Sequence, residues 1–164
     1  MTEEKVVIRF ALAEELDKLE SLWNALYEHQ RSHGMRIALP QAAFSAWATA
    51  IRPSLNRFAI VVVAETVGRF VGFVAGRVRM LPPHFGSNPV GFIGEVFVAD
   101  KHRSGGVGAK LLSSAIEWYR ANGVERIELQ VVSGNPDALR FYERLGWSPE
   151  LVQLTFDTRG SLDQ

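Results

Sequence analysis

The residues from Arg103 to Ala109 form a short glycine-rich turn whose composition suits phosphate binding. Gly105, Gly106 and Gly108 have no Cβ, so a phosphate group can approach the backbone closely. An apolar run at 92–98 precedes the turn and apolar residues at helical spacing follow it, which predicts a strand and then a helix. The first turn of a helix has N–H groups without intrahelical partners, and the helix dipole adds positive charge there. The segment therefore predicts a site for the diphosphate of a nucleotide-like cofactor.

Three kinds of phosphate loop contain such a turn, and spacing distinguishes them. A Walker loop requires Ser or Thr after its lysine, whereas Lys110 is followed by Leu111. A dinucleotide fingerprint requires a further glycine three residues after the Gly106 and Gly108 pair, and Leu111 stands there too. The remaining pattern is Arg103, two residues, glycine, one residue and glycine. Directly after the sequence EVFV, this pattern resembles the acetyl-CoA loop of the GNAT family of N-acetyltransferases. A turn of purely structural use is the alternative, which the combination of strand, arginine and helix disfavours.

Composition limits the other classes of function. The chain has 164 residues, 47% of them hydrophobic, which predicts one compact domain over residues 1–164. A formal net charge of zero gives no electrostatic basis for binding nucleic acid or an anionic membrane. Cysteine is absent and the four histidines lack metal-ligand spacing, so no metal and no cysteine-bound acyl intermediate are expected. The acidic start and the lack of a long apolar run predict a cytoplasmic protein without a signal peptide.

Hydrophobic periodicity predicts alternating strands and helices that position the turn. Strands are expected at 6–10, 58–64, 70–79, 92–98, 124–132 and 151–156, with the second and third joined as a hairpin. Helices are expected over 12–26, from Pro40 to Ile51, after the glycine turn, and over 136–145 with Gly146 as its C-terminal cap. The proline-rich segment 81–91 is expected to be an extended loop. This order indicates a mixed α/β domain.

A second signature lies in the segment NPDALRFYERLGW, which contains Asn135, Ala138, Tyr142 and the pair Gly146 and Trp147. GNAT members typically have asparagine, two residues, alanine, then Phe-Tyr and a Gly-Phe or Gly-Trp pair in this region. Tryptophan replaces the commoner phenylalanine here. The two motifs and the order of elements together make nearly the whole chain resemble a GNAT enzyme. The resemblance implies the GNAT acyl-CoA N-acyltransferase fold, a mixed central sheet with helices on both faces.

The resemblance also implies acetyl-CoA as the acetyl donor, and it assigns residues to hold it. In the family the fourth and fifth strands splay apart, often at a bulge, and pantetheine lies in the gap. Main-chain groups of Val96, Phe97 and Val98 are expected to pair with pantetheine, and an amide near Phe97 or Val98 to polarise the thioester carbonyl. The Asn135 side chain is expected to reach the pantetheine arm from the other side. The residues expected to wrap the pyrophosphate are Arg103, Ser104, Gly105, Gly106, Val107, Gly108 and Ala109.

Two side chains are candidates for proton transfer. Tyr142 is the candidate general acid, because a phenol with a reference pKa of ~10 can protonate a thiolate. Its alternative is packing on an amphipathic helix with the hydroxyl at the surface. Glu95 is the candidate general base, acting through water, because burial in an apolar strand raises the pKa of a carboxyl group. Its alternative is the opposite sheet face with an ion pair to Arg77 or Arg79, and a bulge would make strand alternation a poor guide to the face.

The expected activity is transfer of an acetyl group to a primary amine of a small molecule or peptide. The alternative is a non-catalytic acyl-CoA-binding sensor that has kept the cofactor cleft. No motif identifies the acceptor, although His84, Phe85 and the charged residues at 29–36 lie in segments that shape acceptor pockets in the family. The apolar strand expected at 151–156, together with the frequency of dimers in the family, favours a homodimer.

Overall fold

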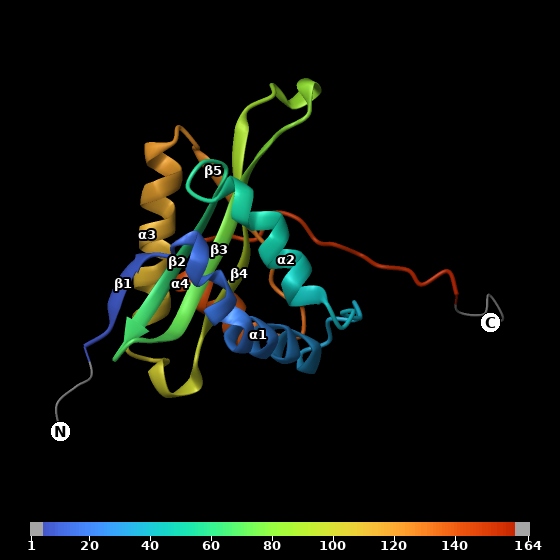
Figure 1. The fold of residues 1–164 in the computed structure, drawn as a ribbon. Helices are drawn as coiled ribbons and strands as arrows, with labels where there is room; N and C mark the ends of the chain where they lie inside the picture. Colours follow the sequence, from blue (N-terminus) through green and yellow to red (C-terminus); the bar gives the residue numbers. More distant parts are fainter. Residues whose placement is uncertain (1–4, 160–164) are drawn as a thin grey trace.

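The protein forms a single five-stranded sheet in a computed structural model, which describes residues 5–159 (Figure 1). The acidic start at residues 1–4 lies outside them. The strands are β1 Val7–Phe10, β2 Ala59–Thr66, β3 Arg69–Met80, β4 Pro89–Val98 and β5 Arg126–Leu129. They lie in sequence order, the first four antiparallel and β5 parallel to β4. The expected mixed α/β sheet is confirmed.

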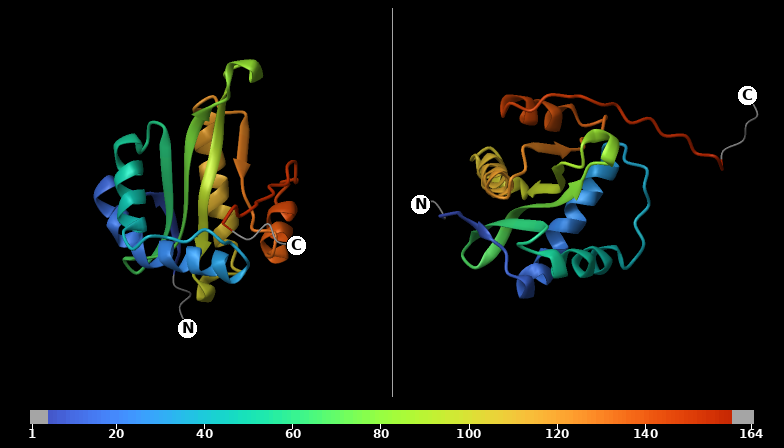
Figure 2. Two further views of the ribbon diagram at one scale, coloured as in Figure 1. Left: turned by 90° about the vertical axis from the view of Figure 1, so that its right-hand side faces the viewer. Right: turned by 90° about the horizontal axis from the view of Figure 1, so that it is seen from above.

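Helices cover both faces of this sheet, as the views from the side and from above show (Figures 1 and 2). The α-helices are α1 Glu20–Ser32, α2 Ala43–Ile51, α3 Val107–Ala121 and α4 Pro136–Arg144. The 3₁₀ segments are η1 Ala13–Leu19, η2 Arg52–Ser54, η3 Pro83–Phe85 and η4 Asp100–His102. Residues of η1, α1 and α2 pack on one face of the sheet, and residues of α3 and α4 pack on the other. Over residues 5–159, none of the helices has the length and apolarity needed to cross a membrane.

The central strand β2 divides the core into two halves. Val61 and Val63 belong to the half under α1 and α2, whereas Ile60 and Val62 belong to the half under α3. Successive residues of a strand point to opposite faces, so a strand covered on both sides is apolar throughout. The run from 59 to 64 has this composition and is fully buried. The predicted hairpin follows it, since Val67 and Gly68 both have positive φ, as a two-residue turn between twisted strands requires.

Two glycines of the sheet determine how closely α3 can approach it. A Cβ on Gly76 would lie 2.2 Å from the Tyr119 hydroxyl oxygen, and a Cβ on Gly91 would lie 2.7 Å from the Tyr119 ring. The buried Tyr119 hydroxyl donates toward the backbone oxygens of Arg77 and Phe92, each 3.3 Å away. This packing fixes α3 against β3 and β4, and with it the position of the glycine-rich turn at the start of α3.

Several expected boundaries are wrong in detail. The segment 81–91 is not an extended loop throughout, because η3 lies within it and β4 begins at Pro89 rather than at 92. The segment 12–26 begins as a 3₁₀ helix, and α1 then continues to Ser32. Helix α2 begins at Ala43 rather than Pro40, and β5 covers 126–129 rather than 124–132. Residues 151–156 form no strand. Their local pattern suits a strand, but a strand also needs a neighbour for backbone hydrogen bonds, and none is present among the described residues.

Candidate active site

Strand β4 carries a bulge and then separates from β5. Ala75 of β3 lies opposite Glu95, and the next residue, Gly76, lies opposite Ile93, so Gly94 is the extra residue. Pairing between β4 and β5 ends at Ile93 and Leu129. Beyond this point β4 has an edge that pairs with no other strand of the described chain. The splay implied by the family resemblance is therefore present, and the bulge lies at its start.

The bulge decides which face of the sheet carries Glu95. Ile93 belongs to the core half under α3, and strict alternation would put Glu95 on the same face. The extra residue reverses the alternation, and Glu95 instead faces α1, where its carboxylate accepts a hydrogen bond of 3.0 Å from the Tyr27 hydroxyl. Val96, one residue further, returns to the α3 face.

Glu95 is buried and has no ion pair within residues 5–159. Arg79, one of the two arginines suggested as partners, instead pairs with Glu128 of β5. The ion pair to Arg77 or Arg79 that the structural alternative requires is thus absent among the described residues. Burial raises the pKa of the Glu95 carboxyl group, while the hydrogen bond from Tyr27 and the positive charge of Arg77 oppose that rise. A raised pKa moves a carboxyl group toward the proton affinity that a general base needs.

Tyr142 lies on α4 and packs on the other face of the sheet. Its half-buried ring meets Trp147 at a centroid distance of 6.0 Å and joins the apolar cluster that includes Val96 and Leu129. Burial raises the pKa of Tyr142, so the phenol remains protonated at neutral pH and is able to donate. The candidate base and the candidate acid therefore lie on opposite faces of the sheet.

The turn before α3 has the backbone form of an anion site. Ser104 and Gly106 both have positive φ, and Gly106 is the N-cap of α3 without a side-chain capping bond. The N–H groups at the start of α3 are thus left for a ligand. Gly108 has a second reason to lack a side chain, because a Cβ there would lie 3.1 Å from the Phe141 ring of α4. A Cβ on Gly105 would meet nothing closer than 4.0 Å.

Arg103 connects the end of β4 to this turn. Its Nε donates to the Val98 carbonyl at 2.8 Å, its guanidinium pairs with Asp100 at 3.0 Å, and the same group lies over the Phe97 ring. Arg103, Phe97 and Asp100 line a groove of about 340 Å³ whose other wall is formed by α1. The residues of that wall are Ala25, Glu28, His29 and Ser32. Burial and the nearby charges of His33 and Arg103 lower the pKa of His29.

Asn135 has a structural role that its motif did not predict. Its side-chain oxygen accepts a hydrogen bond of 3.1 Å from the Ala138 N–H, which makes it the N-cap of α4. The cap fixes the start of the helix that carries Tyr142 two turns later. The side-chain amide group still has its N–H donors to offer to a ligand.

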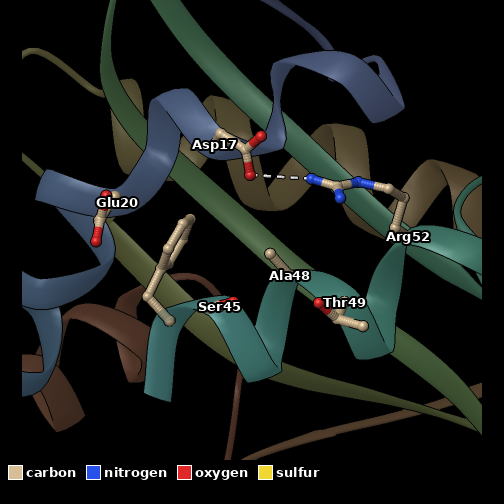
Figure 3. Close-up of a pocket in the computed structure, with 7 residues that line it drawn as sticks. Asp17, Glu20, Ser45, Ala48, Thr49 and Arg52 are labelled. Carbon is tan, nitrogen blue, oxygen red and sulfur yellow. Dashed lines mark hydrogen bonds and ion pairs between the residues drawn. The ribbon is translucent and has the colours of Figure 1, made fainter. Parts of the chain in front are cut away.

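Other candidates from the sequence do not gather at Glu95. His84 and Phe85 stack on each other in η3, at the tip of the loop between β3 and β4. Six residues of strand separate the start of β4 from Glu95, on the order of 20 Å. A second hollow, of about 220 Å³, lies between the η1 and α1 segment and α2 and is bordered by the Asp17–Arg52 ion pair (Figure 3). It includes no residue of β4, α3 or α4.

Tyr27 and Trp47 are the site residues that sequence reasoning missed. Tyr27 follows Leu26 on α1, beside the apolar stripe, and Trp47 belongs to the apolar face of α2. The indole N–H of Trp47 is buried near Glu95 without a hydrogen-bond partner among the described residues, and its partial positive charge lowers the pKa of the Glu95 carboxyl group. No local signal distinguishes these two aromatic residues from ordinary core residues, because their contact with Glu95 depends on the bulge in another element.

The splayed sheet beside a glycine-rich helix start defines the acyl-CoA N-acyltransferase class of fold. The chain belongs to the Acetyltransferase (GNAT) family, whose model matches residues 16–147. An uncharacterized N-acetyltransferase of Archaeoglobus fulgidus is 40% identical over 82 residues, which cover 50% of this chain and 55% of that protein. Uncharacterized N-acetyltransferase MJ1207 of Methanocaldococcus jannaschii is 36% identical over 90 residues, which cover 55% of this chain and 39% of that protein. The chain spans less than two thirds of the length of these curated relatives.

A solved structure shows the same fold over almost the whole chain. Aminoglycoside N-acetyltransferase AAC(6')-Iy, in complex with CoA, superposes with a TM-score of 0.77 at 19% identity. The match covers 97% of this chain and 98% of that one. At this identity the likeness establishes the fold of the chain and leaves the acceptor open.

Proposed function

We propose that the protein is an acetyl-CoA-dependent N-acetyltransferase that acts on a primary amine of a small molecule or peptide, as one domain. Family membership supports the reaction type. The observation that carries the proposal is Glu95, which is buried without an ion pair among residues 5–159 and lies at the start of the open edge of β4. A carboxylate kept for stability alone is normally paired when it is buried, because an isolated buried charge is costly. Its position beside the splay is the one that a base for acyl transfer requires.

Two parts of acetyl-CoA, the pyrophosphate and the pantetheine arm, have proposed binding groups in the chain, and the bound molecule would supply the acetyl thioester. Backbone N–H groups from Ser104 to Ala109 would hold the pyrophosphate, since the start of α3 has no side-chain cap. Main-chain groups of Val96, Phe97 and Val98 would pair with pantetheine along the open edge of β4. The Val98 carbonyl oxygen accepts a hydrogen bond from Arg103, so pantetheine can pair with that oxygen only if this hydrogen bond breaks. The Nδ2 group of Asn135 would donate to pantetheine from α4.

Three groups of the chain would serve the transfer itself. Glu95 accepts a proton from the attacking nitrogen, directly or through water, as the C–N bond forms. An N–H group near Phe97 or Val98 donates to the carbonyl oxygen, on which negative charge develops. Tyr142 gives its proton to the sulfur as the C–S bond breaks. The products are an acetamide and the CoA thiol, and proton exchange with water restores Glu95 and Tyr142.

The first test is release of CoA over a panel of amines, with mass spectrometry of the products. We expect one acetylated amine for each CoA released. Glu95→Gln is expected to lower kcat/KM by ~10²-fold or more at neutral pH, within the range of a positioned base. Glu128→Gln is a matched control on β5, since that carboxylate pairs with Arg79 and Arg126. Tight CoA binding without turnover on any amine would instead favour the sensor.

We also propose that two copies of the chain associate through residues 151–156. Four apolar side chains in this segment, those of Leu151, Val152, Leu154 and Phe156, are between 75% and 89% exposed. The segment leaves the body of the molecule as an extended arm (Figures 1 and 2). Hydrogen bonds join it to the rest of the described chain, between Gln153 and Gln130 and between Thr155 and Arg36. Apolar side chains that are so exposed gain free energy when a second surface covers them.

A further inference from the structure

We infer that Tyr27 is a positioning residue for the proton acceptor: its hydroxyl holds the Glu95 carboxylate ionised and fixed on the α1 face of β4. The inference rests on the proposed role of Glu95 as general base. It assigns a function to a residue that no motif marks. The carrying observation is geometric, a hydrogen bond of 3.0 Å between residues 68 positions apart in the chain.

The position of the Tyr27 ring is set by its neighbours. Its centroid lies 4.3 Å from that of Trp23, one helical turn earlier on α1, and the Trp23 side chain is only 3% exposed. Trp23 in turn packs against Phe44 and Trp47 of α2. A ring held in this way presents its hydroxyl in one direction, which is a requirement for orienting another group.

The other elements packed around Glu95 carry Arg77, Tyr119 and Trp47 near it. Arg77 of β3 contributes a positive charge but forms no ion pair with Glu95, and Tyr119 of α3 donates to backbone oxygens instead. Trp47 of α2 is not titratable, and its N–H has no hydrogen-bond partner in the described chain. The Tyr27 hydroxyl is thus the side-chain donor that bonds the Glu95 carboxylate.

The bond acts on the ionised form of Glu95. A hydroxyl that donates to a carboxylate stabilises the negative charge, so it lowers the pKa that burial raises. The pKa of Tyr27 is itself raised by burial and by the charge of Glu95, so the phenol keeps the proton that it donates. Removal of this hydroxyl is therefore expected to raise the pKa of Glu95 and to leave a smaller fraction of the base ionised.

Tyr27→Phe in the full-length chain tests this directly, because it keeps the ring and deletes the hydroxyl. We expect the acid limb of kcat/KM against pH to move upward by about one pH unit, the loss expected for one hydrogen bond to a charged group. Below the limb kcat/KM falls about tenfold, and above it the value is nearly that of the parent protein. An equal fall at every pH would show a merely structural role and overturn the inference.

Two controls distinguish the effect of losing the Tyr27 hydroxyl from a general loss of structure. Tyr119→Phe removes the other buried phenol near this strand, which has no hydrogen bond to Glu95, and should leave the limb in place. Tyr27→Phe added to Glu95→Gln should cost little more than Glu95→Gln alone, because Tyr27 acts through Glu95. Fully additive losses in the double variant would contradict the inference.

A direct titration distinguishes failure of the inference from failure of the proposed function. Carbon-13 NMR of the labelled glutamate side chains gives the pKa of Glu95, identified by its absence in Glu95→Gln, without any turnover. If Tyr27→Phe raises this pKa while Glu95→Gln remains active, Tyr27 does stabilise the ionised carboxylate of Glu95, but Glu95 is not the base. If the pKa is unchanged by Tyr27→Phe, the inference fails, whatever Glu95→Gln does to the rate.

Discussion

The two faces of β4 differ in how completely they are built. On the α1 face, Glu95 is buried, bonded to Tyr27 and enclosed by aromatic residues of two helices. On the other face, Tyr142 lies on α4, a helix without any fully buried residue, and its hydroxyl has no hydrogen-bond partner among the described residues. The candidate base is thus held by a side-chain hydrogen bond, whereas the candidate acid has no such bond in the described chain.

The difference follows from how each element is anchored. Helices α1 and α2 interlock through large rings, with Trp23 and Trp47 at a centroid distance of 6.1 Å and Trp47 and Phe73 at 6.5 Å. Helix α4 packs on the other half of the core through Phe141 and Tyr142, which are only partly buried, and Phe141 lies over Gly108. Fully buried large rings contribute more free energy than partly buried ones. Preorganisation is therefore concentrated on the side that accepts the proton.

Tyr142→Phe is expected to have the largest effect on the less complete face. The ring packing against Trp147 survives and only the hydroxyl is lost, so the fold and the affinity for acetyl-CoA should be unchanged. If the phenol protonates the leaving sulfur, kcat should fall by ~10²-fold or more, while KM for acetyl-CoA stays nearly constant. Steady-state kinetics with pre-steady-state measurement of the chemical step would show this.

The outcome also tests the contrast between the two faces. An unchanged kcat, with chemistry shown to be rate-limiting, would mean that the sulfur takes its proton from water. Tyr142 would then be a packing residue, and the protein would supply proton transfer on the Glu95 side alone.

The parts of the site that sequence could predict are the ones determined locally. The glycine turn, the strand before it and the helix expected over 136–145 are short motifs whose geometry depends on their own residues. The helix is found at Pro136–Arg144 and the strand covers the expected 92–98, although it begins earlier, at Pro89. The hairpin at Val67 and Gly68 was predictable for the same reason.

The parts that sequence missed depend on distant elements. The face of Glu95 depends on the extra residue Gly94, which is visible only when β4 is paired with β3. The donor to Glu95 comes from α1, 68 residues away. The segment 151–156 has the composition of a strand, but pairing is decided by a neighbour, and the described chain supplies none. Local pattern predicts an element; register and contacts decide its role.

Substitutions in the glycine turn should have the next largest effect, and the structure indicates which one is cleanest. Gly108→Val is expected to weaken acetyl-CoA binding severely, yet it also pushes on Phe141 and so disturbs α4. Gly105→Val has open space around its Cβ and no positive φ, so the fold should be retained. We expect Gly105→Val to weaken binding by about tenfold or more through the bulk placed before the phosphate. Calorimetry measures the affinity and thermal melting the fold.

The two variants distinguish two roles of this turn, phosphate binding and packing against α4. Loss of binding in both, with loss of stability only in Gly108→Val, would support a phosphate site whose helix also packs against α4. If both variants bound acetyl-CoA as the parent protein does, the assignment of the turn to phosphate would be wrong.

Substitutions in residues 151–156, the extended arm that follows α4, are expected to have the smallest effect on catalysis. Because Leu154 and Phe156 are almost fully exposed, replacing both with lysine should leave the fold and kcat within about twofold of the parent values, as surface changes usually do. The parent chain is expected to scatter light with twice its 18.3 kDa mass at micromolar concentration, and the double variant with the monomer mass. Thr158→Lys adds charge to the same arm without removing an apolar side chain, and this variant should remain dimeric.

A monomeric parent chain would contradict the dimer proposal. A dimeric double variant would instead place the interface elsewhere and leave the exposed apolar arm without a partner.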